Sequence, residues 1–309
     1  MRMGLFNVLK PPGMTSHQVV AFLRRITQTK RVGHAGTLDP QAAGVLPVCV
    51  GDATKMIPFL DHHRKIYRVE MLLGITTDTQ DTTGKMTAVC KLIPDKEMVE
   101  QTLNSFMGDY WQIPPMYSAV KKQGKKLYEL ARKGETVERV AKRKEIFEIN
   151  WISMNQDRVR FDVVCSEGTY VRTLCHDVGQ KLGCGATMAF LLRLETCRQS
   201  VHQAITPDEI GDAVNWETLL IPIDKALSNY PAVHIHNSLH KWLFNGVPIQ
   251  IDQIDNDRNH FPNQYLRVYT SDCFVGIGHI NEAGTHFKMV KLLPETASTV
   301  QLSEKQRSR

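Results

Sequence analysis

The sequence predicts an α+β fold in two unequal parts, a large part of mixed helices and strands and a small part that is mostly β. The chain has 309 residues. Because hydrophobic cores usually stop growing short of about 300 residues, we expect a second, smaller core. Apolar residues recur at helical and at strand spacing in turn up to residue 230, and after Pro231 only short β-like runs with one helix remain.

Helix signals are clearest at four places in the large part. Ser16 can cap a helix whose apolar residues lie at 19, 22, 23 and 26. Thr206 is followed by proline at the first helical position and by glutamate at the third, which predicts the last helix of the large part. The other two helices are expected to open at Pro94 and to run from Val171 to Leu182.

Strand signals lie between these helices. Residues 44–50 (GVLPVCV) are typical of a buried strand, in which Pro47 suggests a sheet edge or a bulge. Tyr67 and every second residue up to 73 are apolar, and the residues between them include charges, so one face of this strand is buried. Residues 159–165 alternate in the same way, and we expect a small β domain at about 231–294.

Composition excludes several classes of protein. The chain is 42% hydrophobic and 23% charged, and it has no apolar run near the ~20 residues that a membrane-spanning helix needs. The apolar stretch at the start is too short for a signal peptide, so we expect a cytoplasmic protein. The seven cysteines contain no CxxC pair and suit reduced thiols, without structural zinc or a disulfide framework. The polar tail 295–309 is expected to be disordered.

Positive charge is concentrated in one segment of the chain. Residues 121–144, the basic segment, hold ten Lys and Arg against three Glu, a net charge of +7, whereas the whole chain sums to +6. Most charge runs are solvated helix faces. Here Gly124, Gly134 and paired lysines favour a mobile basic loop that becomes ordered on the phosphates of a nucleic acid.

The densest local signal is a glycine-rich stretch at residues 31–55, RVGHAGTLDPQAAGVLPVCVGDATK. Its polar loop lies just ahead of the predicted strand 44–50, and catalytic groups often lie on such loops. Pro40 pushes Asp39 into an extended conformation, which directs the carboxylate away from its own loop. Local composition alone favours Asp39 and His34 as ordinary turn residues in a glycine-rich connection.

The complete stretch resembles the signature of the TruB-type pseudouridine synthases, in which the Asp of the LDP triplet is the essential catalytic carboxylate. The resemblance covers about residues 1–225. Five further matches follow in chain order: KPPGMTS at 10–16, KIYRVEMLLGITTDTQDTTG at 65–84, PPMYSAVKKQGKKLYELARKG at 114–134, CSEGTYVRTLCHDVG at 165–179 and GATMAFLLRLETCR at 185–198.

The resemblance implies a pseudouridine-synthase-like mixed, mostly antiparallel sheet with flanking helices. It implies a catalytic domain at 1–230 with a basic insertion at about 114–144, and a PUA-like domain at 231–294. The implied activity is isomerisation of uridine to pseudouridine at position 55 in the T loop of tRNA, by base flipping. No cofactor or metal is needed, the implied partner is the tRNA T arm, and a monomer is expected.

Site residues follow from the same resemblance. It implies Asp39, Tyr67 and Arg172 as catalytic residues, with Tyr67 stacked on the uracil and its hydroxyl able to relay the C5 proton. His34 fills the gap left by the extruded base. Tyr67 alone would be interpreted as a core tyrosine and Arg172 as an exposed helix residue. Further substrate-binding candidates are Tyr170, Leu191, Lys10, Lys121, Lys122, Lys125 and Lys126. Glu167 stands where relatives commonly carry a basic or neutral residue.

The chemistry explains these residue types independently of the family. An ionised carboxylate beside the ribose can stabilise positive charge at C1′, attack it, or remove a ribose proton. Each role requires Asp39 to stay ionised in a closed pocket, where desolvation would raise its pKa. Arg172 is the expected opposing cation, because a guanidinium stays charged and binds a carboxylate at two points.

Three alternatives remain open from the sequence. A guide-RNA-dependent synthase of the dyskerin type shares the catalytic block, and a tRNA-binding folding chaperone with a silent pocket would share the fold. A metal site at Cys175, His176 and Asp177 is disfavoured, because adjacent helical residues point in different directions. The pair His62-His63 is interpreted as solvated.

Overall fold

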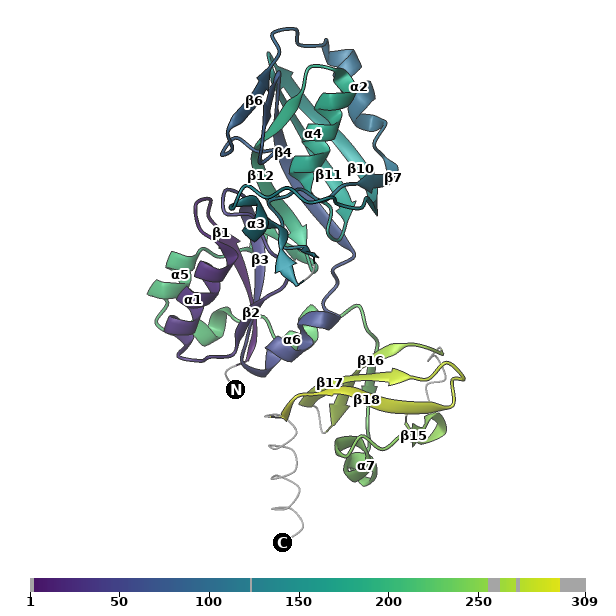
Figure 1. Cartoon of the computed structure of the whole chain (residues 1–309). Coiled ribbons are helices and arrows are strands. Elements are labelled where there is room, and N and C mark those ends of the chain that lie inside the picture. Colours follow the sequence, from purple (N-terminus) through teal and green to yellow (C-terminus); the bar gives the residue numbers. More distant parts are fainter. Residues whose placement is uncertain (1–2, 123, 255–261, 271–272, 295–309) are drawn as a thin grey trace.

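The computed structural model describes residues 3–122, 124–254, 262–270 and 273–294, and shows a large mixed sheet with helices and a smaller β domain (Figure 1). The predicted disordered tail 295–309 lies outside the described residues. No helix within the described ranges is long and apolar enough to cross a membrane. The main sheet has the order β1 (Gly4–Lys10), β3 (Ala43–Val50), β12 (Ala186–Thr196), β4 (Arg64–Leu73), β11 (Arg158–Ser166), β10 (Lys142–Asn155) and β7 (Gly108–Gln112).

Neighbouring strands of this sheet run antiparallel except for β3 and β12. Strand β4 lies at its centre, with its alternate residues from Tyr67 to Leu73 buried as the period-two pattern predicts. Two short strands extend the sheet, β2 (Val32–His34) on β3 and β13 (Gln199–Ser200) on β12. The mixed, mostly antiparallel sheet with flanking helices is therefore confirmed.

Four main helices form at the predicted places: α1 (Ser16–Thr27), α2 (Lys96–Asn104), α4 (Val171–Leu182) and α5 (Pro207–Asp212). The predicted cap at Ser16 is wrong by one residue. Thr15 caps α1, with Gln18 completing a capping box, and this frees the Ser16 hydroxyl for another contact. A short helix α6 (Ile223–Ala226) follows α5, which is therefore not the last helix of this part.

Short hairpins and helical turns connect the main strands and helices. Two-stranded hairpins are formed by β5 (Ile75–Thr77) with β6 (Met86–Val89) and by β8 (Lys121–Lys122) with β9 (Lys125–Lys126). The second hairpin leads into the short helix α3 (Leu127–Ala131). Turns of 3-10 helix are η1 (Gly51–Phe59), η2 (Val201–Gln203), η3 (Trp216–Leu219), η4 (Asn237–Leu239) and η5 (Ile251–Gln253).

Pro47 marks neither a sheet edge nor a bulge, contrary to the prediction. It lies in the middle of β3, opposite Asn7 of β1 in an uninterrupted register. Its carbonyl accepts from Ala35 on the other side of the strand. On that side, β12 pairs with β3 only as far as Gly44, and β2 pairs with β3 only from Val48 onward. Pro47 lies between these two paired stretches, so its missing N–H removes no hydrogen bond from either one.

The parallel contact between β3 and β12 depends on Gly44. This glycine has a φ of +110°, and a Cβ added to it would lie 2.3 Å from the carbonyl oxygen of Arg193. Only glycine allows the two backbones to approach so closely in this conformation. The close approach joins the N-terminal strand pair to the rest of the sheet.

The small domain is built on a second sheet in the order β14 (Ala232–His234), β16 (Tyr265–Thr270), β17 (Cys273–Ile280), β18 (His286–Leu292) and β15 (Ile249–Gln250), with one helix, α7 (His240–Phe244). Leu5 and Met56 of the large domain share a buried cluster with Phe274, Ile277 and Leu293 of the small one. Figure 1 shows this domain beside α6. The shared apolar cluster holds the two domains together.

We predict that Gly44→Ala lowers the free energy of unfolding by about 3 kcal/mol, because it adds both a backbone strain and a clash. Chemical denaturation of the two proteins measures this difference. Gly183→Ala is the matched control, since Gly183 also has a positive φ (+77°) but open space around it. The control should lose only about 1 kcal/mol, and equal losses for both variants would contradict the close-packing argument.

Candidate active site

The loop that carries Asp39 is fixed on both sides of that residue. On one side the Ser16 hydroxyl donates to the carbonyl of Leu38 and accepts from its N–H, each at 3.0 Å. On the other side the carbonyl of Pro40 accepts from the Lys10 ammonium (3.1 Å) and from a backbone N–H (2.8 Å). With both neighbours held, the Asp39 side chain has little choice of direction.

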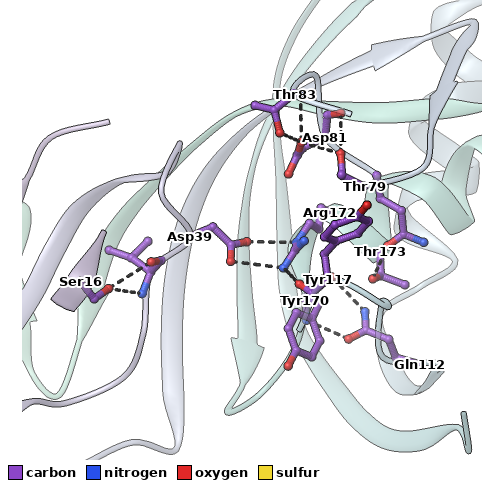
Figure 2. A network of polar contacts seen from close by, with 12 residues as sticks. Ser16, Asp39, Thr79, Asp81, Thr83, Gln112, Tyr117, Tyr170, Arg172 and Thr173 are labelled. Carbon is purple, nitrogen blue, oxygen red and sulfur yellow. Dashed lines mark hydrogen bonds and ion pairs between the residues drawn. The ribbon is translucent and has the colours of Figure 1, made fainter. Parts of the chain in front are cut away.

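Asp39 forms an ion pair with Arg172, as predicted. Nη2 of Arg172 donates to Oδ1 of Asp39 (3.2 Å), and Nε lies 3.0 Å from Oδ2. The arginine side chain is 5% exposed and the carboxylate 35% exposed, so the guanidinium lies beneath and the carboxylate reaches the open pocket. Figure 2 shows the two groups facing each other from opposite sides of the site. The guanidinium therefore holds the carboxylate at two points.

Gln112 places the start of α4, on which Arg172 lies. Its amide donates to the carbonyl of Tyr170 (3.0 Å) and accepts from the N–H of Tyr170 (2.8 Å). Nη2 of Arg172 also donates to the carbonyl of Tyr117 (2.9 Å). Gln112 is 1% exposed, so these bonds are shielded from water. Sequence reasoning missed Gln112, although it lies two residues before the matched stretch 114–134.

Aromatic and apolar side chains form the floor of the site. Tyr67 on β4 and Leu191 on β12 are 7% and 6% exposed, and Tyr170 lies at the start of α4 with its ring next to the Arg172 guanidinium (5.7 Å). Burial raises the pKa of Tyr67 to about 12, although the Arg193 guanidinium acts in the opposite direction. The Tyr67 phenol is therefore protonated at neutral pH.

Two fully buried cations, Lys10 and Arg193, donate hydrogen bonds to the backbone of the loop that carries Asp39. Arg193 donates to the carbonyls of Val45 (2.7 Å), Gly36 (3.1 Å) and Thr37 (3.3 Å). Lys10 donates to the carbonyls of residues 11, 14 and 40. Burial lowers the pKa of Lys10 to about 8. Lys10 was expected to bind substrate, but its ammonium does not line the pocket and is already bonded to three carbonyls.

These groups surround an open pocket of about 830 Å³. Asp39, Tyr67, Tyr170, Arg172 and Leu191 all line it, so residues far apart in the sequence meet at one place. Its size suits a single nucleotide or a similar ligand. Further residues line the pocket that sequence reasoning did not single out: His17, Lys65, Thr79, Asp81, Thr83 and Tyr117.

His34 lies on the wall of this pocket at the end of β2. Its ring contacts the ring of His17 in a tilted arrangement, with 5.6 Å between the ring centroids. Burial lowers the pKa of His34, and the neighbouring His17 acts in the same direction. The neutral imidazole is therefore favoured, which suits contact with an uncharged base rather than with a phosphate.

The basic segment is more regular than the predicted mobile loop. Lys121 pairs with Lys126 and Lys122 with Lys125 in the β8–β9 hairpin, and Leu127 of α3 is buried beneath it. Of these four lysines only Lys126 lines the pocket. The hairpin therefore brings a concentrated positive charge to the rim of the site.

A carboxylate held by an arginine, an aromatic floor and a cationic rim are the arrangement expected of an enzyme that acts on a base of a nucleic acid. Comparison with known proteins agrees. The model of the TruB family pseudouridylate synthase N-terminal domain matches residues 24–171, and that of the tRNA pseudouridylate synthase B C-terminal domain matches residues 172–228. The chain therefore belongs to the TruB family of pseudouridylate synthases.

Individual relatives match nearly the full chain. The tRNA pseudouridine synthase B of Alkaliphilus oremlandii (strain OhILAs) is 43% identical over 290 residues, 94% of this chain and 97% of that protein. That of Clostridium tetani (strain Massachusetts / E88) is 43% identical over 297 residues, with 94% and 99% covered. A solved Cbf5-Nop10-Gar1 complex contains a chain with a TM-score of 0.71 and 25% identity, covering 94% of this chain and 85% of that one.

We predict that Gln112→Met destabilises the protein by about 2 kcal/mol, because it leaves the N–H of Tyr170 unpaired and removes one of the two hydrogen bonds to its carbonyl, which keeps the bond from Leu174. Urea denaturation measures this loss. Gln101→Met on the exposed face of α2 is the control and should change stability by less than about 0.5 kcal/mol. If the two variants unfold at the same urea concentration, the Gln112 amide does not hold the start of α4.

Proposed function

We propose that this protein isomerises the uridine at position 55 in the T loop of tRNA to pseudouridine. The observation that carries the proposal is the Asp39–Arg172 ion pair, held over an aromatic floor inside a nucleotide-sized pocket. The family membership and the relatives named tRNA pseudouridine synthase B support it. Incubation of T-arm RNA with the pure protein, followed by mapping of pseudouridine, tests it directly.

The reaction moves one bond of the nucleotide and needs a charged group beside the sugar. The C1′–N1 bond breaks, the uracil turns within the pocket, C1′ joins C5, and the C5 proton is removed. Asp39 can stabilise C1′, attack it, or take a ribose proton, and each role uses the carboxylate that Arg172 holds in place. Tyr67 stacks on the uracil, and its protonated hydroxyl can pass on the C5 proton.

The uridine has to leave the stacked T loop before it can enter the pocket. Extrusion of a base costs a few kcal/mol, which stacking and phosphate contacts offset. Tyr67 and Tyr170 offer the stacking surfaces, and the lysine hairpin 121–126 offers the phosphate contacts. All the residues that line the described pocket come from one chain, and we propose that the protein acts as a monomer. We also propose that it acts in the cytoplasm.

A guide-RNA-dependent activity of the dyskerin type is the second candidate, because the fold is shared with the Cbf5-Nop10-Gar1 complex. The 43% identity to tRNA pseudouridine synthases B, against 25% to that chain, favours the tRNA enzyme. Modification of a bare tRNA transcript by the purified chain distinguishes the two candidates. A chaperone with a silent pocket would bind and refold tRNA but leave every uridine unchanged.

We predict that Asp39→Asn lowers the single-turnover rate at least about 100-fold, because the amide keeps the shape but not the charge that the reaction needs. Affinity for tRNA should stay within about threefold, since the charge acts on the transition state. Rapid-quench measurement of pseudouridine gives the rate. The control is Asp208→Asn on the exposed first turn of α5, which should react at the wild-type rate. A rate for Asp39→Asn above a tenth of wild type would contradict the assignment.

We predict that replacing Lys121, Lys122, Lys125 and Lys126 by Gln flattens the slope of log affinity against log salt concentration by about three units. Each lysine that releases counterions from the RNA contributes roughly 0.7–0.9 to this slope. Titration of tRNA at several salt concentrations measures it. Binding should weaken most at low salt, where phosphate contacts are strongest.

The control for this titration is a double variant at exposed lysines outside the basic segment, Lys30→Gln with Lys91→Gln. Its slope should stay close to that of the wild-type protein. Parallel slopes for the wild-type protein and the fourfold variant would show that the hairpin is a solvated surface and does not clamp the RNA.

A further inference from the structure

Lys65 is a buried cation in the pocket that the proposed mechanism has not used. It precedes Tyr67 by two residues on β4, so both side chains point to the same face of the sheet. The residue is 7% exposed, and it lines the pocket between Gly36 and the loop at residues 167–169. Its ammonium lies 3.7 Å from the position that a Cβ on Gly36 would take.

The Lys65 ammonium differs from the other two buried cations in its hydrogen bonds. Lys10 and Arg193 each donate to three backbone carbonyls. Lys65 has no side-chain hydrogen bond and no ion pair within 4.0 Å among the residues that the structure describes. Three donors therefore face the pocket without a protein acceptor.

An ammonium buried in this way weakens the folded state. Burial lowers the pKa of Lys65, and the charge of Arg193 acts in the same direction. The carboxylate of Glu167 opposes this shift, but it lies beyond ion-pair distance and on an exposed part of the loop. Such an unfavourable arrangement persists in a fold when it serves a ligand.

We propose that Lys65 is a further substrate-binding residue, whose ammonium binds a uracil oxygen as the base separates from C1′. This inference rests on the proposed function and adds a residue to it. When the C1′–N1 bond breaks, its electron pair goes to N1 and spreads over the ring oxygens. The ammonium stabilises that negative charge until the pair on the ring forms the new C1′–C5 bond, after which the C5 proton leaves.

A base oxygen suits this position better than a phosphate. Lys65 lies beside Tyr67, on which the ring is proposed to stack, and deep in the pocket rather than at its cationic rim. A phosphate beside Lys65 would also lie in the field of the Glu167 carboxylate, which is exposed nearby. A uracil oxygen has its full charge only during the reaction, so the cation acts mainly on the transition state.

The test is Lys65→Met, which keeps the length of the side chain but removes its charge. The single-turnover rate on T-arm RNA should fall about 100-fold, the loss usual for one donor to a developing oxyanion. Affinity should hold within about threefold, and its salt slope should stay unchanged. A slope flatter by roughly 0.7–0.9 together with weaker binding would show a phosphate contact and overturn the proposal.

Thermal unfolding separates this role from a structural one. Lys65→Met should raise Tm by about 2–4 °C, because it removes an unpaired buried charge. Lys10→Met is the matched control of the same residue type. It should lower Tm, since it removes the ammonium that donates to three carbonyls. If Lys65→Met unfolds earlier than the wild-type protein, the lysine supports the fold and the proposal fails.

A substrate with 5-fluorouridine at the target position tests the leaving group itself. Fluorine withdraws electrons, so this ring leaves C1′ with less help from a cation. The rate of glycosidic bond cleavage in Lys65→Met should therefore lie closer to wild type for 5-fluorouridine than for uridine. An equal defect on both rings would overturn the proposal. A wild-type protein without activity on any RNA would instead overturn the proposed function.

Discussion

The close contact of β3 with β12 is the constraint on which the site depends. Gly44 meets the backbone of Arg193 at a distance that excludes any Cβ. That contact brings the Arg193 guanidinium beneath the loop that carries Asp39, where it binds the carbonyls of Gly36 and Thr37. The same strand β12 pairs with β4, so the loop with Asp39 and the strand with Tyr67 are fixed relative to each other. One backbone contact therefore positions both the charge and the aromatic floor.

The buried cations around the site have different partners. Arg193 and Lys10 each donate to three backbone carbonyls, and these bonds hold the loop. Arg172 forms an ion pair with the carboxylate of Asp39. A carboxylate held in place by a buried cation can act on a positive charge that develops beside it. Lys65 completes the pattern as the buried cation that is left for the substrate.

The second domain and the hairpin differ in how firmly they are attached. The C-terminal sheet shares a buried apolar cluster with the large domain through residues such as Phe274 and Met56. The hairpin 121–126 is anchored by fewer buried side chains, chiefly Leu127 and Leu130 of α3, and its lysines are mostly exposed. With fewer buried contacts, the basic hairpin is expected to open at a lower free energy than the small domain does.

The sequence by itself predicted the four main helices and the central strands, because their apolar periods of 3.6 and two are local, but it missed the short helix α6 and the hairpins. Its long motifs also implied Asp39, Tyr67 and Arg172 as site residues, and the structure brings these three side chains to one pocket. Only the tertiary structure decided which lysine braces the loop and which faces the pocket, since Lys10 and Lys65 look alike in the sequence. The role of each depends on acceptors from distant parts of the chain, as with the carbonyl of Pro40 for Lys10, and no local pattern records these contacts.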